Sequence, residues 1–191
     1  MVATKSTMLA LGTAMPEAVL FDGRHHRWST AEVAGQVTVI VFMCNHCPFV
    51  AHIRRELVRC AHELLDAGGA FVAINSNSVD THPQDGPGAM AALAESEGFR
   101  FPYLFDRDHS FALALSASCT PDFYVFGRDQ RLVYRGRFDA STPVNKVPVS
   151  GNELRAAIDA TLDGRPYDKV QEPSLGCNIK WDPGLDVQSQ D

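Results

Sequence analysis

The feature that most constrains this chain is an apolar pattern that changes period twice. Residues 36–43 form a nearly continuous run of β-branched and aromatic side chains, typical of a strand buried on both faces. From Pro48 the apolar residues recur at helical spacing as far as Gly68-Gly69, and residues 70–74 are a second buried run. Strand, helix and strand in this order predict a parallel β–α–β unit, and therefore an α/β fold.

The remaining pattern predicts a mixed central sheet flanked by helices. The chain has 191 residues, and domains commonly have about 150, so we expect one domain over residues 1–165 and an irregular C-terminal extension over 166–191. The other expected elements are an N-terminal β-hairpin within residues 9–35, helices at 89–97 and 111–115, a hairpin of strands 123–126 and 132–135, and a helix at 153–162 capped by Ser150 or Asn152.

Composition excludes several classes of protein. Seventeen basic against 23 acidic residues give a net charge of −6, which argues against nucleic acid as a partner. The sequence has no apolar run of the roughly 18 residues that a membrane helix needs, and Gly12 and Thr13 interrupt the short apolar run at 8–11, so no secretory leader is expected. Five cysteines are too few for a disulfide-stapled secreted fold, which favours a reducing, cytoplasmic location.

The chemistry of the chain is concentrated in Cys44-Asn45-His46-Cys47, which lies between the first buried strand and the first helical turn. Unpaired backbone N–H groups and the positive end of the helix dipole favour a thiolate there and lower the cysteine pKa. Two thiols at this spacing can close a small disulfide ring and reopen it by thiol–disulfide exchange. The position therefore predicts redox chemistry without a cofactor.

Two other interpretations of this motif stay open. Cysteine is among the most buried residue types, so the pair could be two ordinary core residues. Alternatively, Cys44 and Cys47 could join Cys119 and Cys177 as four thiolate ligands of a zinc ion in a non-enzymatic metal-binding module. A structural zinc site usually brings a second close pair of ligands, and Cys119 and Cys177 are isolated in the sequence, so we rank this third.

The chain resembles the thioredoxin-like superfamily, and within it the redoxin branch of the alkyl hydroperoxide reductase and thiol-specific antioxidant type. The resemblance rests on the strand at 36–43, on Cys44-Asn45-His46-Cys47-Pro48 at the start of a helix, and on Thr120-Pro121 before a hairpin. The resemblance covers about residues 9–162. It implies a thioredoxin-like fold in which Pro121 is cis and faces the dithiol, while Thr120 is the backbone partner of the substrate. Uncharacterised redoxin-like proteins with Cys-Asn-His-Cys-Pro are also similar.

The motif departs from the common thioredoxin pattern, and this affects the roles of its residues. Phe42 precedes Cys47 by five residues, the spacing usual for the first active cysteine in thioredoxins, and Pro48 at the first helical position makes Cys47 the N-cap. We therefore expect Cys47 to be the attacking thiolate and Cys44 its partner. The strand at 36–43 contains no acidic residue for proton transfer. The auxiliary candidates for this step are His46, Arg137 and Asp139.

A thiol-dependent peroxidase is the alternative enzyme. The family's peroxidatic motif is Pro-x-x-x-Thr-x-x-Cys, and counting back from either Cys47 or Cys44 finds neither the proline nor the threonine. Peroxide reduction therefore ranks second, although a thiolate near a basic side chain such as Arg135 can still attack a peroxide.

The other cysteines and the loop after the second strand carry weaker expectations. Cys119, two residues before Pro121, and Cys177 in the extension are each a candidate third redox thiol or an inert packed thiol. Cys60 lies near the apolar stripe of its helix, which favours burial. The polar loop 75–88 borders the expected site, and within it His82 and Asp85 are expected to be ordinary solvated residues.

The sequence thus predicts a cytoplasmic thiol–disulfide oxidoreductase with Cys44 and Cys47 as catalytic residues. Thr120 and Pro121 would contact the substrate. Expected partners are protein or small-molecule thiols and disulfides, peroxides for the alternative activity, and a cellular dithiol reductant. No cofactor or metal is expected, and the chain is expected to be a monomer or a homodimer.

Overall fold

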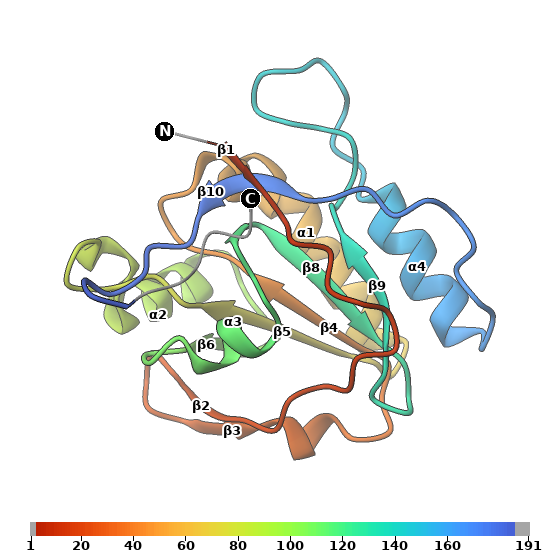
Figure 1. Cartoon of the computed structure of the whole chain (residues 1–191), viewed down its shortest axis with the longest axis horizontal. Coiled ribbons are helices and arrows are strands. Elements are labelled where there is room, and N and C mark those ends of the chain that lie inside the picture. Colours follow the sequence, from red (N-terminus) through yellow and green to blue (C-terminus); the bar gives the residue numbers. More distant parts are fainter. Residues whose placement is uncertain (1–2, 186–191) are drawn as a thin grey trace.

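A mixed seven-stranded sheet forms the centre of the molecule in the computed structural model, which describes residues 3–185. Its strand order is β3-β2-β6-β5-β4-β8-β9, with β4, β5 and β6 parallel and the outer pairs antiparallel. This confirms the expected mixed sheet (Figure 1). The strands are β2 (Val19–Asp22), β3 (Arg27–Ser29), β4 (Thr38–Phe42), β5 (Ala70–Asn75), β6 (Tyr103–Phe105), β8 (Asp122–Phe126) and β9 (Leu132–Gly136).

The β–α–β unit predicted from the apolar pattern is present as β4, α1 (Pro48–Asp66) and β5. Helix α1 buries one stripe of side chains against the sheet, among them Ile53, Leu57 and Leu64. The helix ends at Asp66, and Gly68 two residues later has a φ of +78°, a backbone conformation that glycine adopts without strain. The predicted hairpins are also present, as β2–β3 and β8–β9.

Helices cover both faces of the sheet. Buried residues of α1, α2 (Pro87–Ser96) and α4 (Asn152–Leu162) share one apolar cluster, whereas α3 (Ser110–Ala114) and the 3-10 turn η1 (Thr30–Val33) pack in a second cluster on the opposite face. Alternate residues of β4 belong to the two clusters, because successive side chains of a strand point to opposite faces. None of the described helices has the length and apolar character needed to cross a membrane.

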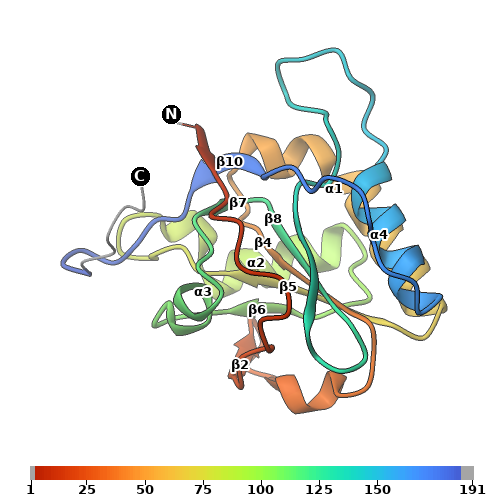
Figure 2. The same cartoon turned by 45° about the vertical axis from the view of Figure 1, so that its right-hand side comes forward.

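A second, three-stranded sheet lies at one end of the first. Its order is β1-β10-β7, all antiparallel, formed by β1 (Ala3–Lys5), β7 (Cys119–Thr120) and β10 (Leu175–Asn178). Strand β1, near the start of the described residues, therefore pairs with β10, near their end, and β10 contacts α1 (Figure 2). The expectation of an irregular C-terminal extension is wrong for β10, because the ladder partners of this strand are β1 and β7, which are distant in the sequence. The predicted boundary at residue 165 stays a prediction.

The start of α4 also differs from the expectation. The N-cap is Gly151, not Ser150 or Asn152, and no side chain caps from within the helix. Instead the Asp139 carboxylate accepts hydrogen bonds from the backbone N–H groups of Ser150 at 2.7 Å and Gly151 at 2.6 Å. Asp139, a sequence candidate for proton transfer, thus fixes the entry to α4 in this structure.

Candidate active site

The two motif cysteines lie where the carboxyl end of β4 meets the start of α1. Cys47 is the N-cap of α1 and Pro48 is in its first turn, as the sequence predicted. Both Cys44 and Cys47 are fully buried, with no exposed surface. The strand-to-helix junction therefore delivers the two sulfur atoms to the interior of the molecule.

The Thr120-Pro121 segment packs directly on this dithiol. Its peptide bond is cis, as the resemblance implied. The carbonyl oxygen of Thr120 is 3.1 Å from Cys47 Sγ, and its hydroxyl oxygen is 3.5 Å from Cys44 Sγ. One residue of β7 therefore touches both sulfur atoms.

A third cysteine completes the cluster. Cys177, on β10, has its Sγ 3.0 Å from Cys47 Sγ, and its side chain is buried. The contact joins residues 130 positions apart in the sequence. The sequence left Cys177 as either a third redox thiol or an inert packed thiol. The structure places it in contact with the dithiol, and its redox role stays a prediction.

Hydrogen bonds lower the pKa of one of the three thiols and raise the pKa of the other two. The pKa of Cys47 is well below its ordinary value, because hydrogen bonds from the Cys44 thiol, the Cys177 thiol, the Thr120 hydroxyl and the Val50 backbone N–H favour the Cys47 thiolate and together outweigh burial. The pKa of Cys44 is raised by its hydrogen bond to Cys47 and by burial, and burial also raises the pKa of Cys177. Cys47 is therefore the thiolate of the cluster.

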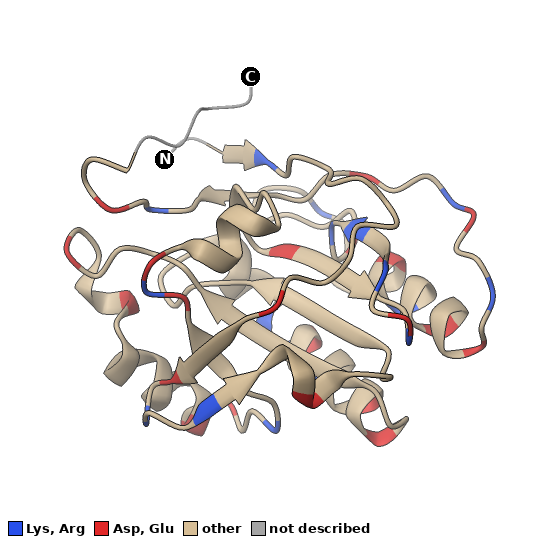
Figure 3. Cartoon of the chain, turned by 60° about the horizontal axis from the view of Figure 1, so that its bottom comes forward, with Lys and Arg blue, Asp and Glu red and all other residues tan. Residues whose placement is uncertain are grey.

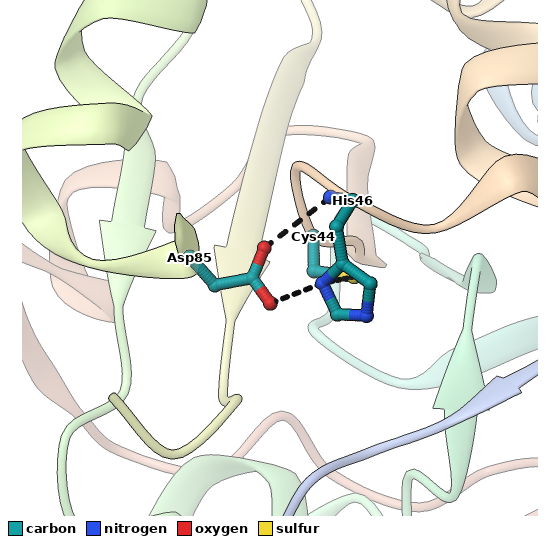
Figure 4. A group of neighbouring side chains, drawn as sticks. All are labelled: Cys44, His46 and Asp85. Carbon is teal, nitrogen blue, oxygen red and sulfur yellow. Dashed lines mark hydrogen bonds and ion pairs between the residues drawn. The ribbon is translucent and has the colours of Figure 1, made fainter. Parts of the chain in front are cut away.

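A buried carboxylate, Asp85, organises the loop that carries the motif (Figure 4). It has no exposed surface and accepts hydrogen bonds from the backbone N–H of Asn45 at 2.9 Å, from His46 Nδ1 at 2.5 Å and from Asn77 Nδ2 at 2.8 Å. The expectation of a solvated Asp85 is wrong, because the 3-10 turn η2 (Pro83–Asp85) directs its side chain inward. No pattern around position 85 signalled this.

His46 lies between Asp85 and the first cysteine. Its Nδ1 is 3.8 Å from Cys44 Sγ as well as 2.5 Å from Asp85 Oδ2, and the ring of His82 stacks on it at a centroid distance of 5.1 Å. The ring is about a fifth exposed. His46 thus connects Cys44 to the surface, and its Nδ1 contacts both a carboxylate and a sulfur atom.

A second buried acid, Asp122, was missed by the sequence analysis because it stands outside the first strand. It follows Pro121, begins β8 and is paired in register with Phe42 of β4. Burial raises its pKa to about 7, against a hydrogen bond from the Tyr124 hydroxyl at 2.9 Å that lowers it. The negative charge of Asp122 contributes to a raised pKa of Cys119, after the larger effect of burial.

The remaining sequence candidates lie around the cluster without reaching its sulfur atoms. The Arg137 guanidinium binds the Glu153 carboxylate, with Nη2 2.8 Å from Oε1, and borders a cavity of about 100 Å³ beside Pro121. Cys119 is buried on β7 and its thiol faces the Pro121 carbonyl at 3.8 Å. Cys60 is buried far along α1, where burial raises its pKa.

The donor atoms beside Cys44 are the candidates for a metal site. Among the described residues, the acidic, histidine and cysteine side chains that form a group of three or more within 4.8 Å of one another are Cys44, His46 and Asp85, not four thiolates. The Asp85 carboxylate already accepts backbone and side-chain hydrogen bonds, and it contacts the imidazole directly. This set fits a hydrogen-bonded triad better than the open, ion-separated ligands of a metal site.

Comparison with known proteins gives matches of two kinds. The model of the AhpC/TSA family matches residues 11–135. The chain is 47% identical to an uncharacterized conserved protein from Geobacillus kaustophilus, with a TM-score of 0.93 over 96% of this chain and 98% of that one. It is 41% identical to a hypothetical protein from Sinorhizobium meliloti 1021, with a TM-score of 0.92 over 95% and 100% of the two chains.

More distant structures share the fold alone. A secreted disulfide oxidoreductase from Mycobacterium tuberculosis is 19% identical, with a TM-score of 0.57 over 75% of this chain and 95% of that one. A search of curated proteins found no match.

Proposed function

The chain belongs to the AhpC/TSA family of thioredoxin-like redoxins, and from this premise we propose that it is a thiol–disulfide oxidoreductase in which Cys47 attacks and Cys44 is its partner thiol. Thioredoxin-like neighbours that include a disulfide oxidoreductase support a thiol redox enzyme in general. The dithiol mechanism is the more specific part of the proposal.

The observation that carries this proposal is the environment of Cys47. It is the N-cap of a 19-residue helix and is surrounded by thiol and backbone donors that lower its pKa. The thiolate is the reactive form of cysteine, so these donors keep the nucleophile populated at neutral pH. An inert core cysteine has the opposite signature, a raised pKa, and Cys60 shows it.

The reaction follows from the two different thiols. The Cys47 thiolate attacks one sulfur of a partner disulfide, a mixed disulfide forms, and the other partner sulfur leaves as a thiolate that takes a proton from solvent. The Cys44 sulfur then attacks Cys47 Sγ, and its proton passes to the departing partner thiolate. The partner gains two electrons as its disulfide is reduced, and the two cysteines lose them.

His46 is the polar side chain beside Cys44 in the second step. Its Nδ1 is 3.8 Å from Cys44 Sγ and 2.5 Å from Asp85 Oδ2, which orients the ring. A polar ring at this place stabilises the negative charge that develops on Cys44 as its proton leaves. Thr120 touches both sulfur atoms and Pro121 is its neighbour, which supports a substrate-contacting role for this pair.

Peroxide reduction is the second candidate, and the family match favours it. Here the Cys47 thiolate attacks the peroxide O–O bond and becomes a sulfenic acid, while the other oxygen leaves as an alkoxide or hydroxide and takes a proton from solvent to give an alcohol or water. Condensation with a neighbouring thiol then gives a disulfide and water. The metal-binding alternative ranks below both, because the donors near Cys44 are engaged with one another.

For partners, we propose protein or small-molecule thiols and disulfides, with a cellular dithiol as the electron source, in the cytoplasm. Acidic and basic residues are interspersed over helices and loops in Figure 3, and the net charge is −6, which supports a partner other than nucleic acid. A monomer or homodimer is proposed from the sequence alone.

The test compares reduction of insulin disulfides with dithiothreitol as electron source in the wild type, Cys47→Ser, Cys44→Ser and the matched control Cys60→Ser. We expect the rate to fall to background in Cys47→Ser, to fall strongly in Cys44→Ser, and to stay at the wild-type level in Cys60→Ser. Full activity in Cys47→Ser contradicts the proposal. Consumption of hydrogen peroxide without insulin reduction favours the peroxidase, and stoichiometric zinc in the purified protein favours the metal module.

A further inference from the structure

Strand β10 occupies the open edge of β7, beside the dithiol. Cys177 is in register with Thr120 and Asn178 with Cys119. At Gly176 an added Cβ would lie 1.9 Å from the Thr120 carbonyl oxygen, so only glycine permits the strand to approach this closely. The extension therefore fills the edge along which any extended chain would approach Cys47 beside β7.

Contacts on both sides hold β10 in this place. Before the strand, the Ser174 N–H donates to Ser6 Oγ at 2.9 Å and its hydroxyl donates to the Gly136 carbonyl at 2.6 Å. After it, the Ile179 N–H donates to the Ser118 carbonyl at 3.0 Å, and the Lys180 N–H donates to Asn77 Oδ1 at 2.9 Å. Cys177 therefore lies in a segment that hydrogen bonds hold in place on both sides.

The geometry between the sulfur atoms is suited to bond formation. Cys177 Sγ is 3.0 Å from Cys47 Sγ, and a disulfide needs about 2.05 Å, so closing the bond takes a movement of about 1 Å. Cys47 makes this contact as the thiolate, and Cys177 as the thiol that donates to it. Cys44 Sγ has other neighbours, the Thr120 hydroxyl at 3.5 Å and His46 Nδ1 at 3.8 Å.

We infer that β10 is a built-in disulfide partner: Cys177 is the thiol that closes a disulfide with Cys47 and releases the substrate, while Cys44 remains a thiol that donates to Cys47. This inference rests on the proposed function, in which Cys47 attacks a partner disulfide, and it replaces Cys44 by Cys177 in the resolving step. It also makes β10 a cover, because a partner disulfide reaches the fully buried Cys47 only when β10 separates from β7.

The Cys47 thiolate attacks the partner disulfide while β10 is displaced, giving a mixed disulfide and one partner thiolate, which is protonated by solvent. When β10 returns to β7, the Cys177 sulfur attacks Cys47 Sγ, the partner sulfur leaves, and the Cys177 proton passes to it. The products are the Cys47–Cys177 disulfide and a reduced partner. A dithiol reductant restores both thiols.

The first measurement needs no variant. The reduced full-length protein is oxidised with glutathione disulfide, remaining thiols are alkylated, and disulfide-linked peptides are mapped by mass spectrometry. We expect the linked pair Cys47–Cys177, with Cys44 alkylated. A Cys44–Cys47 link with Cys177 alkylated overturns this inference and leaves the proposed function standing. Alkylation of Cys47 at every glutathione ratio overturns the proposed function itself.

Kinetics of matched variants test the order of events. In Cys177→Ser the mixed disulfide of Cys47 with glutathione should persist at least about ten-fold longer than in the wild type, because an intramolecular thiol at fixed distance is lost. In Cys44→Ser the Cys47–Cys177 link should still form, and in Cys60→Ser nothing should change. Equal lifetimes in Cys177→Ser and the wild type overturn the inference, and circular dichroism confirms that each variant is folded.

Discussion

At the scale of the residue, the site is governed by which thiol among three holds the negative charge. The helix dipole and the Val50 N–H favour a thiolate at Cys47, and neither Cys44 nor Cys177 has a helix start beside it. Once Cys47 is charged, each neighbouring thiol is drawn to donate to it, which lowers the Cys47 pKa further and raises the other two. The cluster is therefore asymmetric although its members are chemically identical.

This asymmetry gives a prediction for the thiolate titration. Because the pKa values of the other four cysteines are raised, the ultraviolet absorbance step at acidic pH belongs to Cys47. Cys44→Ala removes the largest favourable hydrogen bond, so the step should move to higher pH. Cys44→Ser keeps a donor there, so its step should move less.

The measurement is absorbance at thiolate wavelengths against pH for the wild type and both variants, with Cys60→Ser as control. The step should vanish in Cys47→Ser and be unchanged in Cys60→Ser. An identical midpoint in Cys44→Ala and the wild type would show that Cys44 does not set the Cys47 pKa.

At the scale of the element, two segments position the chemistry in different ways. Helix α1 presents Cys47 through its N-terminus, and its apolar stripe anchors it to the sheet over five turns. Strand β10 has only four residues and depends on its neighbours β1 and β7 for all its ladder hydrogen bonds. Short strands held from both sides open at lower free energy than core strands, which suits an element that must leave to expose Cys47.

Gly176→Ala tests this dependence. The added methyl group meets the Thr120 carbonyl oxygen, so β10 should separate from β7 and Cys47 should react faster with iodoacetamide, by roughly ten-fold or more if the steric cost is about 1–3 kcal/mol. The matched control is Gly88→Ala in α2, where a Cβ meets nothing within 4 Å. Peptide mapping after timed alkylation gives the Cys47 rate. An unchanged rate in Gly176→Ala would mean that β10 does not cover the thiolate.

At the scale of the whole molecule, the sheet buries the Asp122 carboxyl near the site, and this burial makes the free energy of unfolding depend on pH. Burial raises the pKa of Asp122 from 3.8 to about 7, so the folded state holds a proton that the unfolded state loses between these values. This contribution to stability is fully present below pH about 4, is lost as the pH rises through about 7, and is then constant. Groups with strongly shifted pKa values are common at functional sites.

Asp122→Asn should remove this pH dependence. The variant should gain stability relative to the wild type as the pH rises from about 4 to about 7, reaching roughly 4 kcal/mol above that range. Urea unfolding at several pH values measures the difference between the two proteins, and the exposed Asp168→Asn is the control, expected to show no such trend. A difference that stays constant from pH 5 to pH 8 would mean that Asp122 is ionised throughout this range.

The sequence by itself determined the local elements and the place of the motif. The β–α–β unit, the hairpin of β8 and β9, and the position of Cys47 at the start of α1 follow from periodicity and from Pro48, because these signals act between residues a few positions apart. The family resemblance added the cis peptide before Pro121, which the structure shows.

Only the tertiary structure decided which side chains meet. The contact of Cys47 with Cys177 spans 130 residues and that of His46 with Asp85 spans 39, while Asp122 is buried by the neighbouring strand β4. No local pattern encodes such contacts, because they depend on the order of strands in two sheets and on the pairing of β10 with β1 and β7. The motif predicts redox chemistry, and the tertiary structure decides which side chains lie close enough to change the pKa values of its cysteines.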